Sequence, residues 1–164
     1  MANPQQPWQH APLRAKVLFL AGVFFLFSSI GFIGDILAMG KEPWARLILT
    51  VALSGGFAIL YAVAGFRLRG RAWVAMVPIF LLQFLFTGLI ANRFPSQAAP
   101  RQMGPAEISA LDYRLGIDGF GVIVVMVGGY VCFLYFAITE GRRHFRVQAE
   151  MELAAEIHKG LVPP

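Results

Sequence analysis

The chain has 164 residues, of which 57% are hydrophobic and only 14% are charged, and its mean hydropathy is +0.63. Soluble domains are usually about 45–50% apolar and roughly 25% charged, so the composition predicts an integral membrane protein instead. The net charge of +5 does not indicate nucleic-acid binding, because the arginines stand in short clusters between apolar runs. The single cysteine, Cys132, excludes a disulfide framework within the chain.

Four apolar runs reach the roughly twenty residues that a helix needs to cross a bilayer. Each run must be helical, because the hydrocarbon core offers backbone amides no hydrogen-bond partner. The predicted fold is therefore all-α, with an N-terminal tail, a four-helix transmembrane region and a C-terminal helical segment. The predicted boundaries are residues 1–16 for the tail, 17–139 for the transmembrane region (helices 17–38, 44–66, 72–91 and 119–139) and 140–164 for the C-terminal segment.

Positive residues beside the runs predict the orientation, since short cytoplasmic loops are enriched in lysine and arginine. Arginines cluster after the second and fourth runs. They are Arg67, Arg69, Arg71, Arg142, Arg143 and Arg146. We therefore expect a multi-pass protein of the bacterial inner membrane with both termini in the cytoplasm. Residues 92–118 are then an extracytoplasmic loop, in which Pro105–Leu115 could form a short surface helix with proline at its first position.

Asp35 is the acid that lies well within a predicted span. A carboxylate inside a membrane is a candidate for proton or cation coupling. In the predicted orientation Asp35 lies near the outer interface, where it could reach water or pair with Lys41 or Arg46. We interpret it as an interfacial structural residue, with coupling as the alternative, and expect Asp35→Asn to cost little.

Small residues within the runs predict close helix packing, because they let helix backbones approach each other in lipid. The small residues in question are Ser28, Gly31, Gly34, Thr50, Ser54, Gly55, Gly121, Gly128 and Gly129. We favour packing within one chain, and a dimerisation surface is the alternative. Gln83 is expected to hydrogen-bond to another helix.

Catalytic groups are not predicted in these 164 residues. The three histidines stand in the terminal segments without ligand spacing, and the carboxylates are too dispersed for a two-metal centre. We therefore expect no catalytic, cofactor-binding or metal-binding residue here.

The segment of residues 140–164 is a helix-favouring, amphipathic stretch. Its apolar residues fall at spacings of three and four, which is typical of a coiled-coil seam. The seam residues are Val147, Met151, Ala154, Ile157 and Leu161. The seam predicts a homodimer in which the segments of two copies pair. Membrane anchoring favours this pairing because it raises the effective concentration of the helices. The alternative, a tail lying on lipid, is opposed by the acidic residues on the other face.

Residues 148–164, QAEMELAAEIHKGLVPP, resemble the linker that enters the catalytic domain of SpoIIE/RsbU-type protein serine phosphatases. The residues that match are Glu150, Glu152, Leu153, Ala154, Glu156, Ile157, Leu161 and Pro163. His158 stands where glutamine is commoner, and Gly160 stands where a small polar residue is commoner. The four apolar runs themselves resemble no named sensor family.

The resemblance implies a membrane sensor or anchor module that regulates a phosphatase domain following the linker. In that family the linker helices pair across a dimer, and two manganese or magnesium ions in the phosphatase serve to dephosphorylate a serine of an anti-sigma-factor antagonist. We expect the phosphatase domain to be missing from this chain. A full-length parent that contains the domain would be a hydrolase. The alternative is a stand-alone small membrane scaffold or transporter-like subunit.

The orientation predicts opposite labelling at two positions in a Cys132→Ala background. Ser96→Cys should react with a membrane-impermeant thiol reagent in intact cells, because residue 96 lies in the extracytoplasmic loop. Arg69→Cys should react only after the membrane is opened. Labelling at position 69 but not at position 96 would reverse the orientation.

Overall fold

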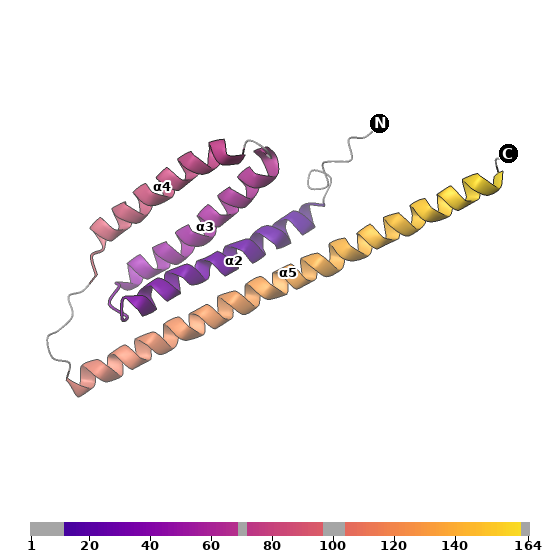
Figure 1. Ribbon diagram of the computed structural model, residues 1–164. Coiled ribbons are helices and arrows are strands. Elements are labelled where there is room, and N and C mark those ends of the chain that lie inside the picture. Colours follow the sequence, from indigo (N-terminus) through magenta and orange to yellow (C-terminus); the bar gives the residue numbers. More distant parts are fainter. Residues whose placement is uncertain (1–11, 69–71, 97–103, 162–164) are drawn as a thin grey trace.

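The computed structural model describes residues 12–68, 72–96 and 104–161, with side chains up to residue 140. Four helices follow one another along the chain: α2 (Leu13–Leu37), α3 (Trp44–Leu68), α4 (Ala72–Arg93) and α5 (Pro105–Leu161) (Figure 1). None of the described residues forms a strand. Each helix contains a stretch long and apolar enough to cross a membrane. The prediction of an all-α chain with four candidate spans is confirmed for these residues.

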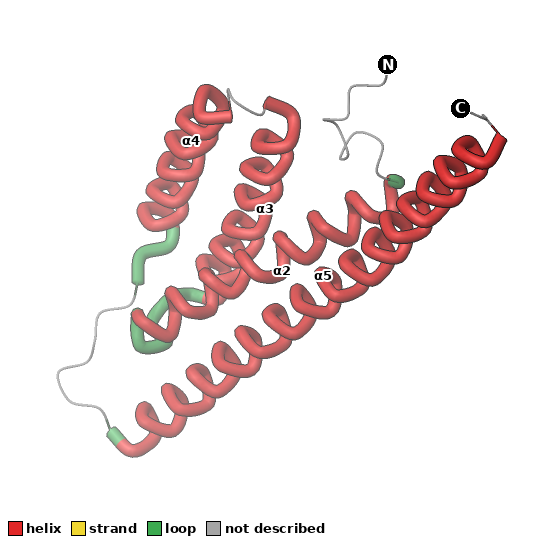
Figure 2. Tube along the Cα trace, turned by 45° about the vertical axis from the view of Figure 1, so that its right-hand side comes forward, coloured by secondary structure: helices red, strands yellow, loops and turns green. Residues whose placement is uncertain are grey.

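The helices lie side by side in the order α4, α3, α2, α5 (Figures 1 and 2). α2 packs against both α3 and α5, whereas α4 packs chiefly against α3. Accordingly α2 contributes seven buried residues and α4 contributes none. α2 is the central helix of this arrangement, and α4 is a peripheral one whose surface is available to lipid.

α5 differs from its predicted extent, since it begins at Pro105, inside the expected loop of residues 92–118. Proline suits a first helical position because its missing N–H would have no helical partner there. The backbone N–H of Gly104 donates to the carboxylate of Glu107 at 3.0 Å, which caps the new helix. No later proline interrupts α5, so the second half of the expected loop is the first part of a 57-residue helix.

Glycines set the close approach of α2 to its neighbours. A Cβ atom built on Gly31 would lie 2.7 Å from the backbone nitrogen of Val51 in α3. One on Gly55 would lie 2.6 Å from Ser28 Oγ, and one on Gly121 would lie 2.6 Å from the ring of Phe32. These contacts confirm packing within the chain for three of the predicted small residues. Gly34 differs, because a Cβ atom built there would have nothing within 4 Å.

An aromatic cluster joins the same three helices near the beginning of α2. The ring of Phe19 meets those of Phe66, Phe133 and Phe136 edge-on, with centroids 5.4 Å apart in each pair. Such T-shaped contacts favour a defined geometry over a merely apolar one. α2 is therefore fixed to α3 and α5 at this end by aromatic packing.

Gly31→Ala should lower the free energy of unfolding by about 1–3 kcal/mol, because the added methyl group would meet α3 backbone that cannot move alone. Gly34→Ala, three residues along the same helix, is the matched control and should be neutral or slightly stabilising. Thermal unfolding of the purified protein in detergent measures both changes. Equal losses at the two positions would contradict the proposed α2–α3 contact.

Candidate functional site

The turn after α2 is built around the carboxylate of Asp35. Met39 and Gly40 adopt positive φ angles of 57° and 65°, which reverses the chain. Gly40 N–H then donates to the Asp35 carbonyl at 2.8 Å. The backbone N–H of Glu42 donates to Asp35 Oδ1 at 2.9 Å. Asp35 therefore stabilises the turn that leads into α3.

Glycine at position 40 also makes room for an arginine from α5. A Cβ atom on Gly40 would lie 2.9 Å from Cγ of Arg114. The positive φ and the close approach both favour glycine here. The turn is thus shaped to admit the Arg114 side chain.

Arg114 connects α5 with α2, with the turn and with α3. Its Nε donates to Asp35 Oδ2 at 2.8 Å, and its Nη2 lies 2.6 Å from the same oxygen. Nη2 also donates to the Glu42 carbonyl at 3.3 Å. The guanidinium carbon stands 3.3 Å from the centroid of the Trp44 ring, which is a cation–π contact. One side chain therefore joins three helices.

Asp118 lies one helical turn beyond Arg114 and adds a second buried carboxylate. Its Oδ2 is 3.5 Å from Arg114 Nε. Asp35 and Asp118 are both 0% exposed, and Arg114 is 9% exposed. Both carboxylate oxygens of Asp118 lack a hydrogen-bond partner. Two buried carboxylates therefore share one guanidinium, in the arrangement that we call the charge cluster (Asp35, Arg114 and Asp118).

A second ion pair flanks the charge cluster. Arg46 Nη2 lies 3.0 Å from Glu42 Oε1. Arg46 Nη1 donates to Ser96 Oγ at 2.8 Å. Burial raises the pKa of Glu42, while the Arg46 guanidinium opposes that rise. Arg46 thereby links the turn to the residues that follow α4.

The expected partners of Asp35 were wrong. Asp35 is buried rather than open to water, and it pairs with Arg114 rather than with Lys41 or Arg46. Asp35→Asn is consequently expected to be costly, since it replaces the charge-assisted hydrogen bonds from the Glu42 N–H and from Arg114 by weaker neutral ones. Arg114 and Asp118 were missed as site residues. Their opposite charges at i and i+4, directly before an apolar run, were the available signal.

The other predicted residues are not brought to this cluster. Arg67 lies in the last turn of α3. Arg69 and Arg71 lie outside the described residues. The remaining predicted positions belong to the backbone of α5, but their side chains lie outside the described part of the chain: Arg142, Arg143, Arg146, Val147, Met151, Ala154, Ile157 and Leu161.

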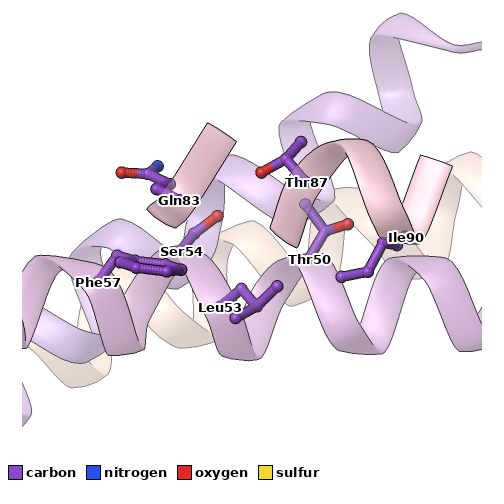
Figure 3. Close-up of a pocket in the computed structure, with 7 residues that line it drawn as sticks. All are labelled: Thr50, Leu53, Ser54, Phe57, Gln83, Thr87 and Ile90. Atoms are coloured by element: carbon purple, nitrogen blue, oxygen red, sulfur yellow. The ribbon is translucent and has the colours of Figure 1, made fainter. Parts of the chain in front are cut away.

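The structure contains two hollows, one beside the charge cluster and one apart from it. One of about 340 Å³ opens beside the charge cluster and is lined by Lys41, Trp44, Tyr113 and Arg114 among others. The other, of about 20 Å³, lies between α3 and α4, where polar side chains approach each other (Figure 3). Its polar lining consists of Thr50, Ser54, Gln83 and Thr87.

The smaller hollow is large enough for about one water molecule. Next to it, Tyr61 in α3 donates a hydrogen bond to Gln83 Oε1 in α4 at 3.0 Å. The expected interhelical bond of Gln83 is thereby confirmed. We call the four polar lining residues and Tyr61 the polar strip. It is the polar contact that holds α4 on α3.

Among the residues that the structure describes, no three His, Cys, Asp or Glu side chains come together as a metal site would require. The site is instead a buried ionic contact between helices, in a described part of the chain that is all-α and has four candidate spans. No protein-family model matches the chain, and comparisons with curated proteins and with solved structures find no match.

Arg114→Gln should lower the free energy of unfolding by about 3–5 kcal/mol, because it leaves the buried Asp35 carboxylate without the cation that it pairs with. Arg93→Gln, at an exposed arginine of α4, is the control and should change stability little. Thermal unfolding in detergent near neutral pH separates the two variants. Similar melting temperatures for both would show that the charge cluster does not hold α5 to α2.

Proposed function

We propose that this chain is the membrane sensor or anchor module of a SpoIIE-type serine phosphatase and regulates that domain through the helix that leads to it. The observation that carries the proposal is the continuity of α5 from Pro105 to Leu161. One helix contains Arg114 and Asp118 of the charge cluster, the fourth candidate span and the backbone of the linker-like segment. A movement of α5 at the charge cluster would therefore be transmitted along the same helix to the segment that resembles the phosphatase linker.

The length of α5 supports this role. At about 1.5 Å per residue, its 57 residues extend roughly 85 Å, far more than the roughly 30 Å of a bilayer core. Its C-terminal part continues past the ends of the other three helices (Figure 1). In the proposed topology both termini are cytoplasmic, so this extension carries the linker away from the inner membrane toward the phosphatase.

The proposed partner is a second copy of the chain. Parallel linkers would pair through Val147, Met151, Ala154, Ile157 and Leu161, and their arrangement would set the activity of the phosphatase domains. Two manganese or magnesium ions and the anti-sigma-factor antagonist belong to that domain. A marginal seam suits a switch, because a small bias from the membrane region is then enough to shift it.

A stand-alone scaffold is the second candidate function, favoured by α4, which buries none of its residues and could contact another membrane protein. The coding sequence beyond the Pro164 codon separates the two. A continuing frame with the metal-binding aspartates of a phosphatase supports the module. A frame that encodes no such domain contradicts it.

Single cysteines placed from position 147 to position 161 test the proposed pairing in membranes of the Cys132→Ala protein. Cross-linking should peak every three to four residues, because only the seam faces the second copy. Met151→Glu should weaken cross-linking at the neighbouring seam positions by burying a charge. Gln148→Glu, one turn earlier and off the seam, is the matched control. A flat profile would reduce the segment to a tether.

A further inference from the structure

The charge cluster contains one more negative than positive group. Asp35 and Asp118 both lie at 0% exposure, and Arg114 is the cation that contacts them. Full ionisation would therefore leave a net charge of −1 between α2 and α5. An uncompensated buried charge costs several kcal/mol, and proteins usually avoid that cost by taking up a proton.

Neighbouring groups do not remove this imbalance. From α3, Arg46 faces Glu42 of the turn, and these two neutralise each other at 3.0 Å. Lys41 lines the hollow together with Arg114, and no described ion pair joins it to either aspartate. On α5 itself, Asp112 is exposed. Among the described residues, the cluster therefore keeps its negative excess.

We propose that Asp35 and Asp118 together form a binding site for a single proton, which the folded protein retains at neutral pH. The hydrogen bonds indicate which of the two carboxyl groups holds the proton. The oxygens of Asp35 already accept from the Glu42 N–H and from Arg114. Neither oxygen of Asp118 has a donor. The proton is therefore held on Asp118.

The proton is exchanged with water through the side of Arg114. That residue is 9% exposed and lines the hollow of about 340 Å³, whereas the aspartates behind it are closed off. Loss of the proton places two carboxylates against one guanidinium and weakens the contact of α5 with α2. This site is a property of the four-helix region, and it does not depend on which domain follows Pro164.

Infrared spectroscopy of the 164-residue protein in lipid vesicles tests the site, because the C=O stretch of a protonated carboxyl is separate from carboxylate bands. At about pH 7 exposed aspartates are ionised. The wild type should nevertheless show one protonated carboxyl that disappears in alkaline buffer. Asp112→Asn, the matched control at an exposed position of the same helix, should keep this band.

Two isosteric variants make the charge balance itself measurable. Asp118→Asn should lose the band, because it removes the group that holds the proton. Asp35→Asn should lose it as well, because one remaining carboxylate balances Arg114 and needs no proton. The wild-type measurement does not require either variant to fold.

Three results would overturn the proposal. They are a wild type without a protonated carboxyl at about pH 7, a band that persists in Asp35→Asn, and a band that responds to sodium concentration instead of pH. The second would mean that burial of Asp118 alone holds the proton, and the third that a metal cation competes for the site. None of these readings involves a phosphatase, so their failure is separate from failure of the proposed function.

Discussion

The ion pair of Asp35 and Arg114 is the contact around which this end of the molecule is arranged. It joins residues 79 positions apart in the chain and is almost fully shielded from water. Apolar packing distinguishes poorly between a neighbouring helix and lipid, because both surfaces are equally apolar. A buried ion pair does distinguish them, since neither charge finds a partner in hydrocarbon. The pair therefore specifies which helix lies beside α2 and at what height.

Two different kinds of contact fix α2 along its length. Phe19 packs among three aromatic rings at one end, and Asp35 binds Arg114 at the other. Between them, Gly31 and Gly55 let α3 approach closely. α4 lacks comparable contacts and is held by a polar strip that includes the Tyr61–Gln83 bond. Helices α2, α3 and α5 thus form the packed centre of the described structure, and α4 packs on its periphery against α3.

The spans could be predicted from sequence because each is a long apolar run, and run length depends on nothing outside the segment. A short helix beginning at Pro105 could also be predicted, but its continuity with the fourth span could not. Asp118 and Arg114 look like the polar end of a loop when each charge is counted alone. Arg114 and Asp118 can nevertheless lie in a helix that packs against α2, because Arg114 pairs with Asp35 of α2. The sequence of α5 alone does not reveal this tertiary contact. For the same reason Asp35 could be singled out as a candidate, but its partner could not be named.

The polar beginning of α5 has a consequence for the thickness of the membrane around it. The apolar run of residues 119–139 extends roughly 32 Å as a helix, and the 22 residues of α4 extend roughly 33 Å, so both are close to a typical hydrocarbon core. The turn that carries Arg114 and Asp118 directly precedes this run and is suited to the headgroup region. A thicker bilayer would draw that turn toward hydrocarbon, where an ionised carboxyl is least tolerable. Bilayer thickness and the proposed proton on Asp118 are therefore linked quantities.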